Sequence, residues 1–202
     1  MAQRLKAVER RSSILAVAKV VFADRGYHGV SVDEIARRRG VSPAVLYRHF
    51  DSKEALYEAV LTEIACHRES YVEAVLAGPD DLGSVLLRMT QVYARSVARD
   101  PDYLRMEMQS VLEGAAAAQQ FFDSRWKSFA DFIEIRFSEL APQGRVRQIN
   151  ARAASLMFQG TVREALYAKR IVNSARHKDI PLDDPIEQLI QLFLDAIGYQ
   201  SP

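Results

Sequence analysis

The stretch SVDEIARRRGVSPAVLYRHFDSK, residues 31–53, decides how this chain folds. It predicts two short helices joined by a tight turn, with a third helix directly behind them. Ser31 and Glu34 have the spacing of a capping box, in which each side chain bonds the backbone amide of the other residue. Gly40 ends the first helix, because glycine adopts the left-handed conformation without steric cost. These signals predict a helix-turn-helix at about residues 31–50.

The second helix of this stretch has clear start signals. Ser42 suits the N-cap, and Pro43 suits the first turn, where its missing N–H is not needed. Asp51 and Glu54 form a further capping box that opens the third helix. A buried face runs through the stretch at helical spacing, and it consists of Val32, Ile35, Ala36, Leu46 and Phe50.

The opposite face of the second helix suits the major groove of DNA, which the second helix of such a motif enters. It combines small, aromatic and basic side chains with no acid among them, namely Pro43, Ala44, Tyr47, Arg48 and His49. The alternative is a helical hairpin inside an ordinary bundle. The two caps, the turn glycine and the acid-free face together favour a DNA-binding motif.

Residues from about Arg10 to Val60 resemble the DNA-binding domain of the tetracycline-repressor (TetR) family. The chain departs from the family pattern at Ala44-Val45, where the family often has Gly-Thr, so a hydroxyl that faces the DNA is missing. The positions that carry the resemblance are Ile14, Ala18, Phe22, Gly26-Tyr27, Ser31, Ile35-Ala36, Gly40-Val41-Ser42, Leu46-Tyr47, His49-Phe50 and Ser52-Lys53-Glu54.

Three kinds of DNA contact are expected from these residues. The helix N-termini at Ser31 and Ser42 can offer amides and hydroxyls to phosphates. Tyr47 and Lys53 resemble the tyrosine and lysine with which the family contacts the DNA backbone. Base edges are left to the remaining outward residues, among which arginine favours guanine and the small apolar groups suit a thymine methyl. These residues are Pro43, Ala44, Arg48 and His49.

The charge of the chain is unevenly distributed. The 202 residues carry a net charge of +1. Residues 1–60 hold 11 Lys and Arg against 7 Asp and Glu, whereas the rest of the chain holds 16 against 19. A basic head on a slightly acidic body fits a nucleic-acid-binding module joined to another domain. We therefore expect a DNA-binding domain at residues 1–55 and a ligand-binding and dimerisation domain at residues 56–202.

The hydrophobic pattern predicts an all-α chain of about nine helices, because no alternating strand pattern and no internal repeat occurs. Around the helix-turn-helix, the first helix spans about residues 8–25 and a long helix spans about 52–76. The next two helices are expected at about 81–99 and from there to about 112. Gly114 and the four alanines after it are either a loose turn or the frayed start of the following helix, which carries the aromatic residues of 121–137 and ends before Pro142. The last two helices are expected at about 147–172 and 185–198.

The last of these helices indicates a dimer. Its apolar positions cover an arc of roughly 220°, wider than one buried face requires. Gly160, Ala153 and Ala154 in the preceding helix are small enough for close helix approach. The resemblance implies the same arrangement, since family members dimerise through their last two long helices. Such a homodimer would bind the two half-sites of a palindromic operator in double-stranded DNA. The alternative is that the last helix is a central core helix.

The resemblance also implies a ligand-responsive repressor, in which a small molecule bound in the body releases the protein from its operator. Aromatic residues are numerous in the body and favour an apolar or aromatic effector, although such residues at helical spacing are also ordinary core. The candidate ligand-binding residues are Tyr93, Tyr103, Met106, Phe122, Trp126, Phe129, Phe158 and Tyr167.

Other classes of protein find less support in the sequence. The single cysteine, Cys66, is consistent with a reducing compartment, and no window resembles a membrane span of roughly 18 apolar residues. We therefore expect a cytoplasmic protein without a membrane partner. No cofactor, metal site or catalytic residue is predicted, because no motif for one occurs. The alternatives are an activator, a regulator controlled by a protein partner, and an all-helical enzyme whose helix-turn-helix is only a fold element.

Overall fold

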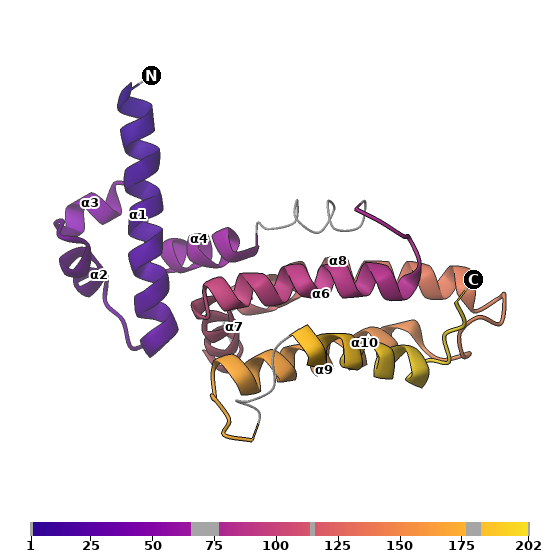
Figure 1. Ribbon diagram of the computed structural model, residues 1–202. Helices are drawn as coiled ribbons and strands as arrows, with labels where there is room; N and C mark the ends of the chain where they lie inside the picture. The colour runs from indigo at the N-terminus through magenta and orange to yellow at the C-terminus, as the bar shows by residue number, and fades with distance from the viewer. Residues whose placement is uncertain (1, 66–76, 114–115, 177–182, 202) are drawn as a thin grey trace. The chain divides into compact units, whose positions relative to one another are not determined.

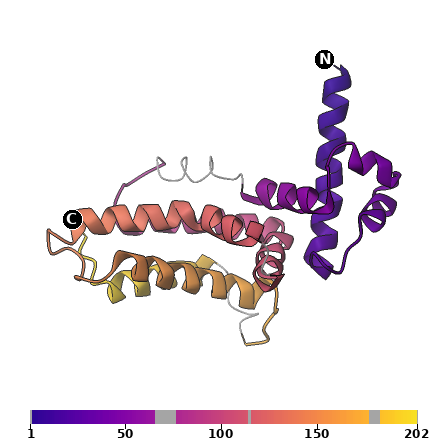
Figure 2. The ribbon, with the colours of Figure 1, turned by 180° about the vertical axis from the view of Figure 1, so that it is seen from behind.

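The computed structural model describes residues 2–65, 77–113, 116–176 and 183–201. Within these ranges the chain forms nine helices and no strand (Figures 1 and 2), which confirms the predicted all-α class. None of the described helices is both long enough and apolar enough to cross a membrane. The helices are α1 (Ala2–Arg25), α2 (Val32–Arg39), α3 (Pro43–Tyr47), α4 (Lys53–Ala65), α6 (Leu82–Arg99), α7 (Asp102–Glu113), α8 (Ala116–Leu140), α9 (Ala151–Arg170) and α10 (Asp183–Ala196).

The chain divides into two compact units. Unit 1 consists of Met1–Cys66 and Asp102–Asp123, and unit 2 consists of His67–Pro101 and Ser124–Pro202. Unit 1 therefore contains the first four helices together with α7, which lies against α1. The functional division between residues 1–55 and 56–202 stays a prediction.

Unit 1 is built around one apolar core. Phe22 of α1 is fully buried and meets the ring of Tyr57 from α4 edge to face, with ring centroids 5.0 Å apart. Met106 of α7 is part of the same core. The other fully or nearly fully buried members come from all four N-terminal helices and include Ile14, Ala18, Ile35, Ala36, Leu46, Leu56 and Val60.

The boundaries of the helices in unit 1 follow local sequence signals, with one exception. The first helix ends at Arg25, as predicted, and Gly26 follows it in the left-handed conformation at φ 70°. The cap of α4 was predicted at Asp51, and this is wrong. Ser52 is the cap, because its hydroxyl accepts a hydrogen bond of 3.1 Å from the amide of Ala55. The part of the predicted long helix beyond Ala65 lies outside the described residues.

Unit 2 contains α6, most of α8, α9 and α10, each of which turns an apolar face inward. Aromatic rings join the four helices in series. The ring centroids of Tyr93 in α6 and Trp126 in α8 are 5.0 Å apart. Those of Phe129 in α8 and Phe158 in α9 are 5.6 Å apart. The centroids of Phe158 and Phe193 in α10 are 5.0 Å apart. Aliphatic side chains fill the space around these rings, among them Val85, Leu86, Met89, Ile133, Val162, Leu166, Ile190 and Ile197.

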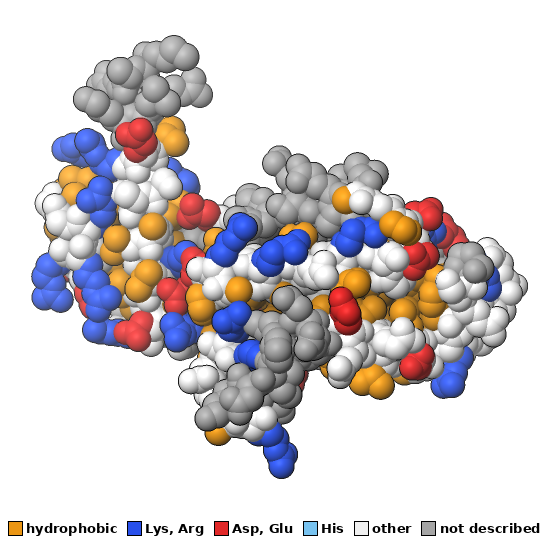
Figure 3. Space-filling view, in the orientation of Figure 1, with side chains coloured by type: hydrophobic (Ala, Val, Ile, Leu, Met, Phe, Trp, Pro, Cys, Tyr) orange, Lys and Arg blue, Asp and Glu red, His pale blue; other side chains and the backbone are white. Residues whose placement is uncertain are grey.

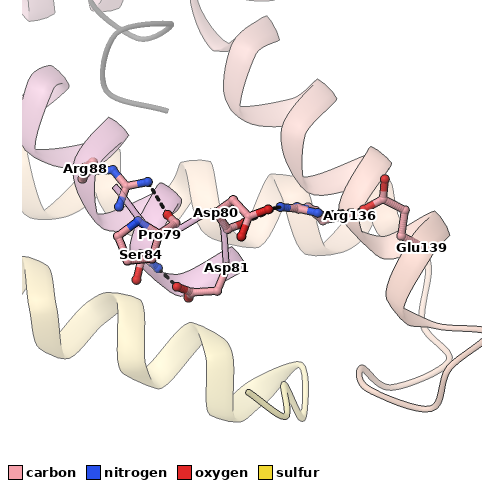
Figure 4. Close-up of polar contacts among 7 residues, drawn as sticks. All are labelled: Pro79, Asp80, Asp81, Ser84, Arg88, Arg136 and Glu139. Atoms are coloured by element: carbon pink, nitrogen blue, oxygen red, sulfur yellow. Dashed lines mark hydrogen bonds and ion pairs between the residues drawn. The ribbon is translucent and has the colours of Figure 1, made fainter. Parts of the chain in front are cut away.

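Two arginines hold the loop that leads into α6 (Figure 4). Arg88 of α6 donates to the carbonyl of Pro79, and Arg136 of α8 donates to the carbonyl of Asp80. Asp81 then caps α6, since its carboxylate accepts from the amide of Ser84 at 3.0 Å. The start of this helix is thereby fixed to α8 within unit 2.

The start of α9 differs from the prediction of about Arg147. Asn150 caps this helix, with its side-chain oxygen accepting from the amide of Arg152 at 2.9 Å. The residues just before it pair with the end of the chain instead. The Arg147 amide donates to the Ile197 carbonyl at 2.8 Å, and the Gln200 amide donates to the Arg145 carbonyl at 3.0 Å. The C-terminal tail therefore holds residues 145–147 against the residues after α10, and α9 begins only after Asn150.

Candidate nucleic-acid interface

The apolar face of the helix-turn-helix packs into the core of unit 1. Val32, Ile35 and Ala36 of α2 are buried, and so is Leu46 of α3. Gly40 joins the two helices with a φ of 74°. Its backbone amide donates to the carbonyls of Ala36 and Arg37 at the end of α2. These contacts confirm the predicted helix, turn and helix. They also determine which side of α3 faces outward.

The N-terminus of α2 is capped on one side only. The Ser31 hydroxyl accepts from the amide of Glu34 at 3.2 Å, as predicted. The Glu34 carboxylate does not complete the capping box, because it pairs with the guanidinium groups of Arg25 at 3.0 Å and Arg38 at 3.5 Å. Ser31 itself is exposed at the end of the helix, so its hydroxyl remains accessible to an oxygen acceptor.

The outer face of α3 is open to solvent. Ser42 occupies the N-cap position in an extended conformation and makes no capping hydrogen bond, and Pro43 is at the first turn. Tyr47 is 52% exposed. Ala44 and Arg48 are also exposed, whereas Pro43 and His49 are half-buried. The structure therefore places the predicted base-reading residues around one short helix.

Basic side chains surround this helix. Figure 3 shows Lys and Arg side chains gathered over the part of the molecule that carries α1, α2 and α3. Arg37 and Arg38 of α2 are exposed. Arg11 of α1 lies with its guanidinium carbon 5.0 Å from the centre of the Phe50 ring, at the end of the helix-turn-helix. Such a surface attracts the phosphate backbone of nucleic acid.

Lys53, the predicted phosphate-contacting lysine, is held at the start of α4. Its Nζ lies 4.2 Å from the centre of the Tyr27 ring, within the range of a cation–π contact. The Tyr27 hydroxyl donates to the Glu54 carboxylate. This hydrogen bond lowers the pKa of Glu54, and burial together with Glu54 raises the pKa of Tyr27 to about 12. Tyr27 was not among the predicted site residues, although its place beside Gly26 is part of the sequence pattern that the prediction used.

The structure brings together only some of the predicted ligand-binding residues. Tyr93, Trp126, Phe129 and Phe158 form one packed aromatic group in unit 2. Phe193 of α10 extends this group and was not predicted as a ligand contact. Buried polar groups were also missed, because they occupy positions in otherwise apolar helical faces. In unit 2 they include Thr90 of α6 and the hydrogen-bonded pair Ser155 and Gln159 of α9, and in unit 1 they include Glu107 and Ser110 of α7.

The other predicted ligand-binding residues lie elsewhere. Met106 belongs to the core of unit 1, and Tyr103 packs against that core with Lys19 Nζ 4.8 Å from its ring centre. Tyr167 is half-buried on α9. Phe122 lies outside the residues whose side chains are described. Tyr103 and Met106 of α7 are therefore not part of the aromatic group of unit 2.

The family model of bacterial regulatory proteins, tetR family, matches residues 14–60. These residues include α2, α3, the turn between them and the start of α4, which is the region that forms the candidate interface. Residues 14–60 of the chain therefore belong to the TetR family.

One relative of this chain is the HTH-type transcriptional activator FasR of Mycolicibacterium smegmatis. It is 40% identical over 118 residues, which make up 57% of this chain and 54% of FasR. A second, the HTH-type transcriptional regulator RutR of Escherichia coli O157:H7, is 24% identical over 204 residues, which make up 96% of this chain and 94% of RutR. The chain thus spans about half the length of FasR and nearly all of RutR.

Solved structures share the whole fold at low identity. AibR in complex with isovaleryl coenzyme A and operator DNA has a TM-score of 0.68 and 22% identity, and the match covers 95% of this chain and 100% of that chain. This similarity extends beyond residues 14–60 and supports the observed order of helices in both units.

Proposed function

We propose that this protein is a cytoplasmic, dimeric, sequence-specific transcriptional regulator, and that an apolar effector releases it from its operator. In this proposal residues 1–55 bind DNA and residues 56–202 bind the effector and form the dimer. The observation that carries the proposal is the open outer face of α3, where Ala44, Tyr47 and Arg48 are exposed, in a unit that also exposes Arg11, Arg37 and Arg38. We propose that the exposed residues of α3 serve to bind DNA in transcriptional regulation, and that they have no catalytic role.

The DNA contacts follow from the placement of these side chains. Arg48 carries a planar group with several donors and is exposed on α3, so it is our candidate for reading a guanine edge. Lys53 and Tyr47 are our candidates for phosphate contacts, which fix the position of the protein without reading sequence. Exposed Ser31 at the N-terminus of α2 adds a hydroxyl beside the positive end of a helix dipole.

The dimer is supported by an apolar face on the last two helices. Leu192 of α10 is 62% exposed, although five other apolar residues of that helix and the turn after it are buried in unit 2. Leu156 and Met157 of α9 are 64% and 42% exposed. Gly160 has open space where a side chain would be. A second copy of the chain would cover these groups, which is the use of α9 and α10 that we propose.

The effector is assigned to the interior of unit 2. The aromatic group of Tyr93, Trp126, Phe129, Phe158 and Phe193 offers apolar surface, and the buried polar residues of this unit include Thr90, Ser155 and Gln159. Isovaleryl coenzyme A is the ligand named for AibR. We therefore propose a mainly apolar effector with a polar end, and acyl thioesters are the first compounds to test.

DNA binding is tested by fluorescence anisotropy with the DNA flanking the gene of this protein, unrelated competitor DNA and a salt series. Lys53→Ala should weaken binding to all sequences and lower the salt slope by about 1. Arg48→Ala should relax the preference at one base pair. The control is Lys127→Ala in unit 2, which removes an exposed lysine paired with Asp131 and should leave binding unchanged. Weak binding that is equal for every sequence would contradict the proposal.

The dimer is tested separately by analytical ultracentrifugation. A charge in the proposed interface, as in Leu192→Glu, should give monomers, because an unpaired charge would be buried there. Ile135→Glu is the matched control, since Ile135 of α8 is 57% exposed and lies outside α9 and α10. Equal behaviour of the two variants would exclude this face as the interface.

Activation is a second candidate for the direction of regulation, because FasR is named a transcriptional activator. A reporter gene behind the operator distinguishes the two directions. Deleting the gene of this protein should raise reporter expression if it represses, and lower it if it activates.

A further inference from the structure

Glu113, the last residue of α7, bonds two other parts of unit 1. Its carboxylate accepts from the backbone amide of Tyr27 through Oε1 and from the hydroxyl of Tyr57 through Oε2, the latter at 3.3 Å. Tyr27 lies just after α1, and Tyr57 lies in α4. A single carboxylate therefore connects the end of α7 to the turn after α1 and to the first part of α4.

The turn after α1 leaves room for this carboxylate. Gly26 has a φ of 70°, and a side chain at this position would collide with Oε1 of Glu113. Tyr57 is only 2% exposed, and its pKa is raised by burial and by the charge of Glu113. Buried donors that lose their acceptor are costly, so the carboxylate is held where it satisfies them.

Tyr27 links this carboxylate to the DNA-binding face. Its backbone amide bonds Glu113, and its ring lies 4.2 Å from Lys53 Nζ. Its hydroxyl bonds Glu54, the residue that follows Lys53. Tyr27 thus contacts both the ammonium group of Lys53 and the first turn of α4.

The chain connects α7 to the other unit at both ends. The helix α6, which precedes it, belongs to unit 2, and so does α8 from Ser124 onward. The helix α7 itself belongs to unit 1. A rearrangement of α6 and α8 within unit 2 would therefore pull on a helix whose last residue holds Tyr27.

We propose that Glu113 is a positioning residue for DNA binding, which places Lys53 through Tyr27 and transmits movements of α7 to this phosphate contact. This inference rests on the proposed function, in which Lys53 contacts the DNA backbone. It names Glu113 and Tyr27 as the residues through which the effector state of unit 2 alters DNA affinity.

The decisive experiment is a double-mutant cycle on operator affinity. Glu113→Ala should lower the affinity about tenfold, since hydrogen bonds to a charged group are lost. In the Lys53→Ala background the same change should have little further effect, because its route to the DNA has been removed. Losses that add independently would overturn the proposal, and so would an increase in affinity. Glu63→Ala removes an exposed carboxylate from the same unit and serves as the control.

Two conservative variants separate position from charge. Glu113→Gln keeps an acceptor oxygen in place and should cost about twofold, whereas Glu113→Asp keeps the charge but shortens the side chain and should resemble Glu113→Ala. The opposite ranking would overturn the positioning role. These variants also decide the question if Glu113→Ala proves too unstable to study.

A DNA-independent readout distinguishes failure of this inference from failure of the proposed function. Lysines are labelled by reductive methylation with carbon-13, and the Lys53 signal is assigned by its loss in Lys53→Arg. The Tyr27 ring should shift this signal upfield, and Glu113→Asp should reduce the shift. A Lys53 signal that is unchanged in Glu113→Asp overturns the inference, whether or not the wild-type protein binds a specific DNA site.

Discussion

The helix-turn-helix of unit 1 and the aromatic interior of unit 2 are stabilised by contacts of different range. In α2 and α3 the decisive bonds join close neighbours, such as Ser31 with Glu34 and Gly40 with Ala36. In unit 2 the decisive contacts join distant residues, and the ring series runs from Tyr93 to Phe193. Short-range signals therefore describe the DNA-binding region well, whereas unit 2 depends on tertiary packing.

The largest expected effect comes from the ring series. Phe158 is 1% exposed and contacts both Phe129 and Phe193, so Phe158→Ala should lower the free energy of unfolding by about 3–5 kcal/mol. Urea titration followed by the fluorescence of Trp126, the single tryptophan of the chain, measures this change within unit 2. Ile135→Ala on α8 is the control, because Ile135 is exposed and lies outside the proposed dimer face, and it should change the free energy by less than about 0.5 kcal/mol. Similar losses for both would show that the ring series is not the core of this unit.

The fold was predictable where local signals act alone. Gly26, Ser31 and Gly40 mark helix ends that the structure confirms. The prediction failed at the start of α4, where the neighbouring Ser52 and not Asp51 is the cap, and it failed where a distant segment intervenes. The backbone groups before α9 pair with the C-terminal tail, and no local signal near Arg147 reveals this.

The candidate site was predictable to a similar extent. The outward face of α3 follows from helical periodicity, and its exposed residues match that expectation. The aromatic candidates were harder, because helical spacing does not say which core a residue enters. Met106 and Trp126 are both large apolar residues on the buried face of a helix, and the sequence does not distinguish their surroundings. In the structure Met106 packs in unit 1 and Trp126 packs in unit 2. Glu113 was missed because its partner Tyr27 is 86 residues away.

A glycine substitution should have opposite effects in the two regions. Gly40 has open space around it but a φ of 74°, so Gly40→Ala should destabilise the protein by about 1–2 kcal/mol through backbone strain. Gly160 lies inside α9, also with open space around it, so Gly160→Ala should stabilise the monomer by about 0.5–1 kcal/mol through helix propensity. Thermal unfolding of both variants at low protein concentration compares them. Destabilisation by Gly160→Ala that appears only at high concentration would place a partner helix against this residue.

The smallest effect is a pH dependence that arises in unit 1. Burial and the bond to Glu54 raise the pKa of Tyr27 from 10.0 to about 12. The folded protein therefore holds this proton more tightly than the unfolded chain does. The resulting stabilisation is fully present below pH 10 and is lost as the pH rises toward 12. Tyr27→Phe should reduce the fall in unfolding free energy between about pH 8 and about pH 11, measured by urea titration with circular dichroism. The fall should not vanish, because the buried hydroxyl of Tyr57 also has a raised pKa. An unchanged pH dependence in Tyr27→Phe would mean that the Tyr27 hydroxyl does not hold its proton through Glu54, and that only its ring and backbone amide act on the first turn of α4.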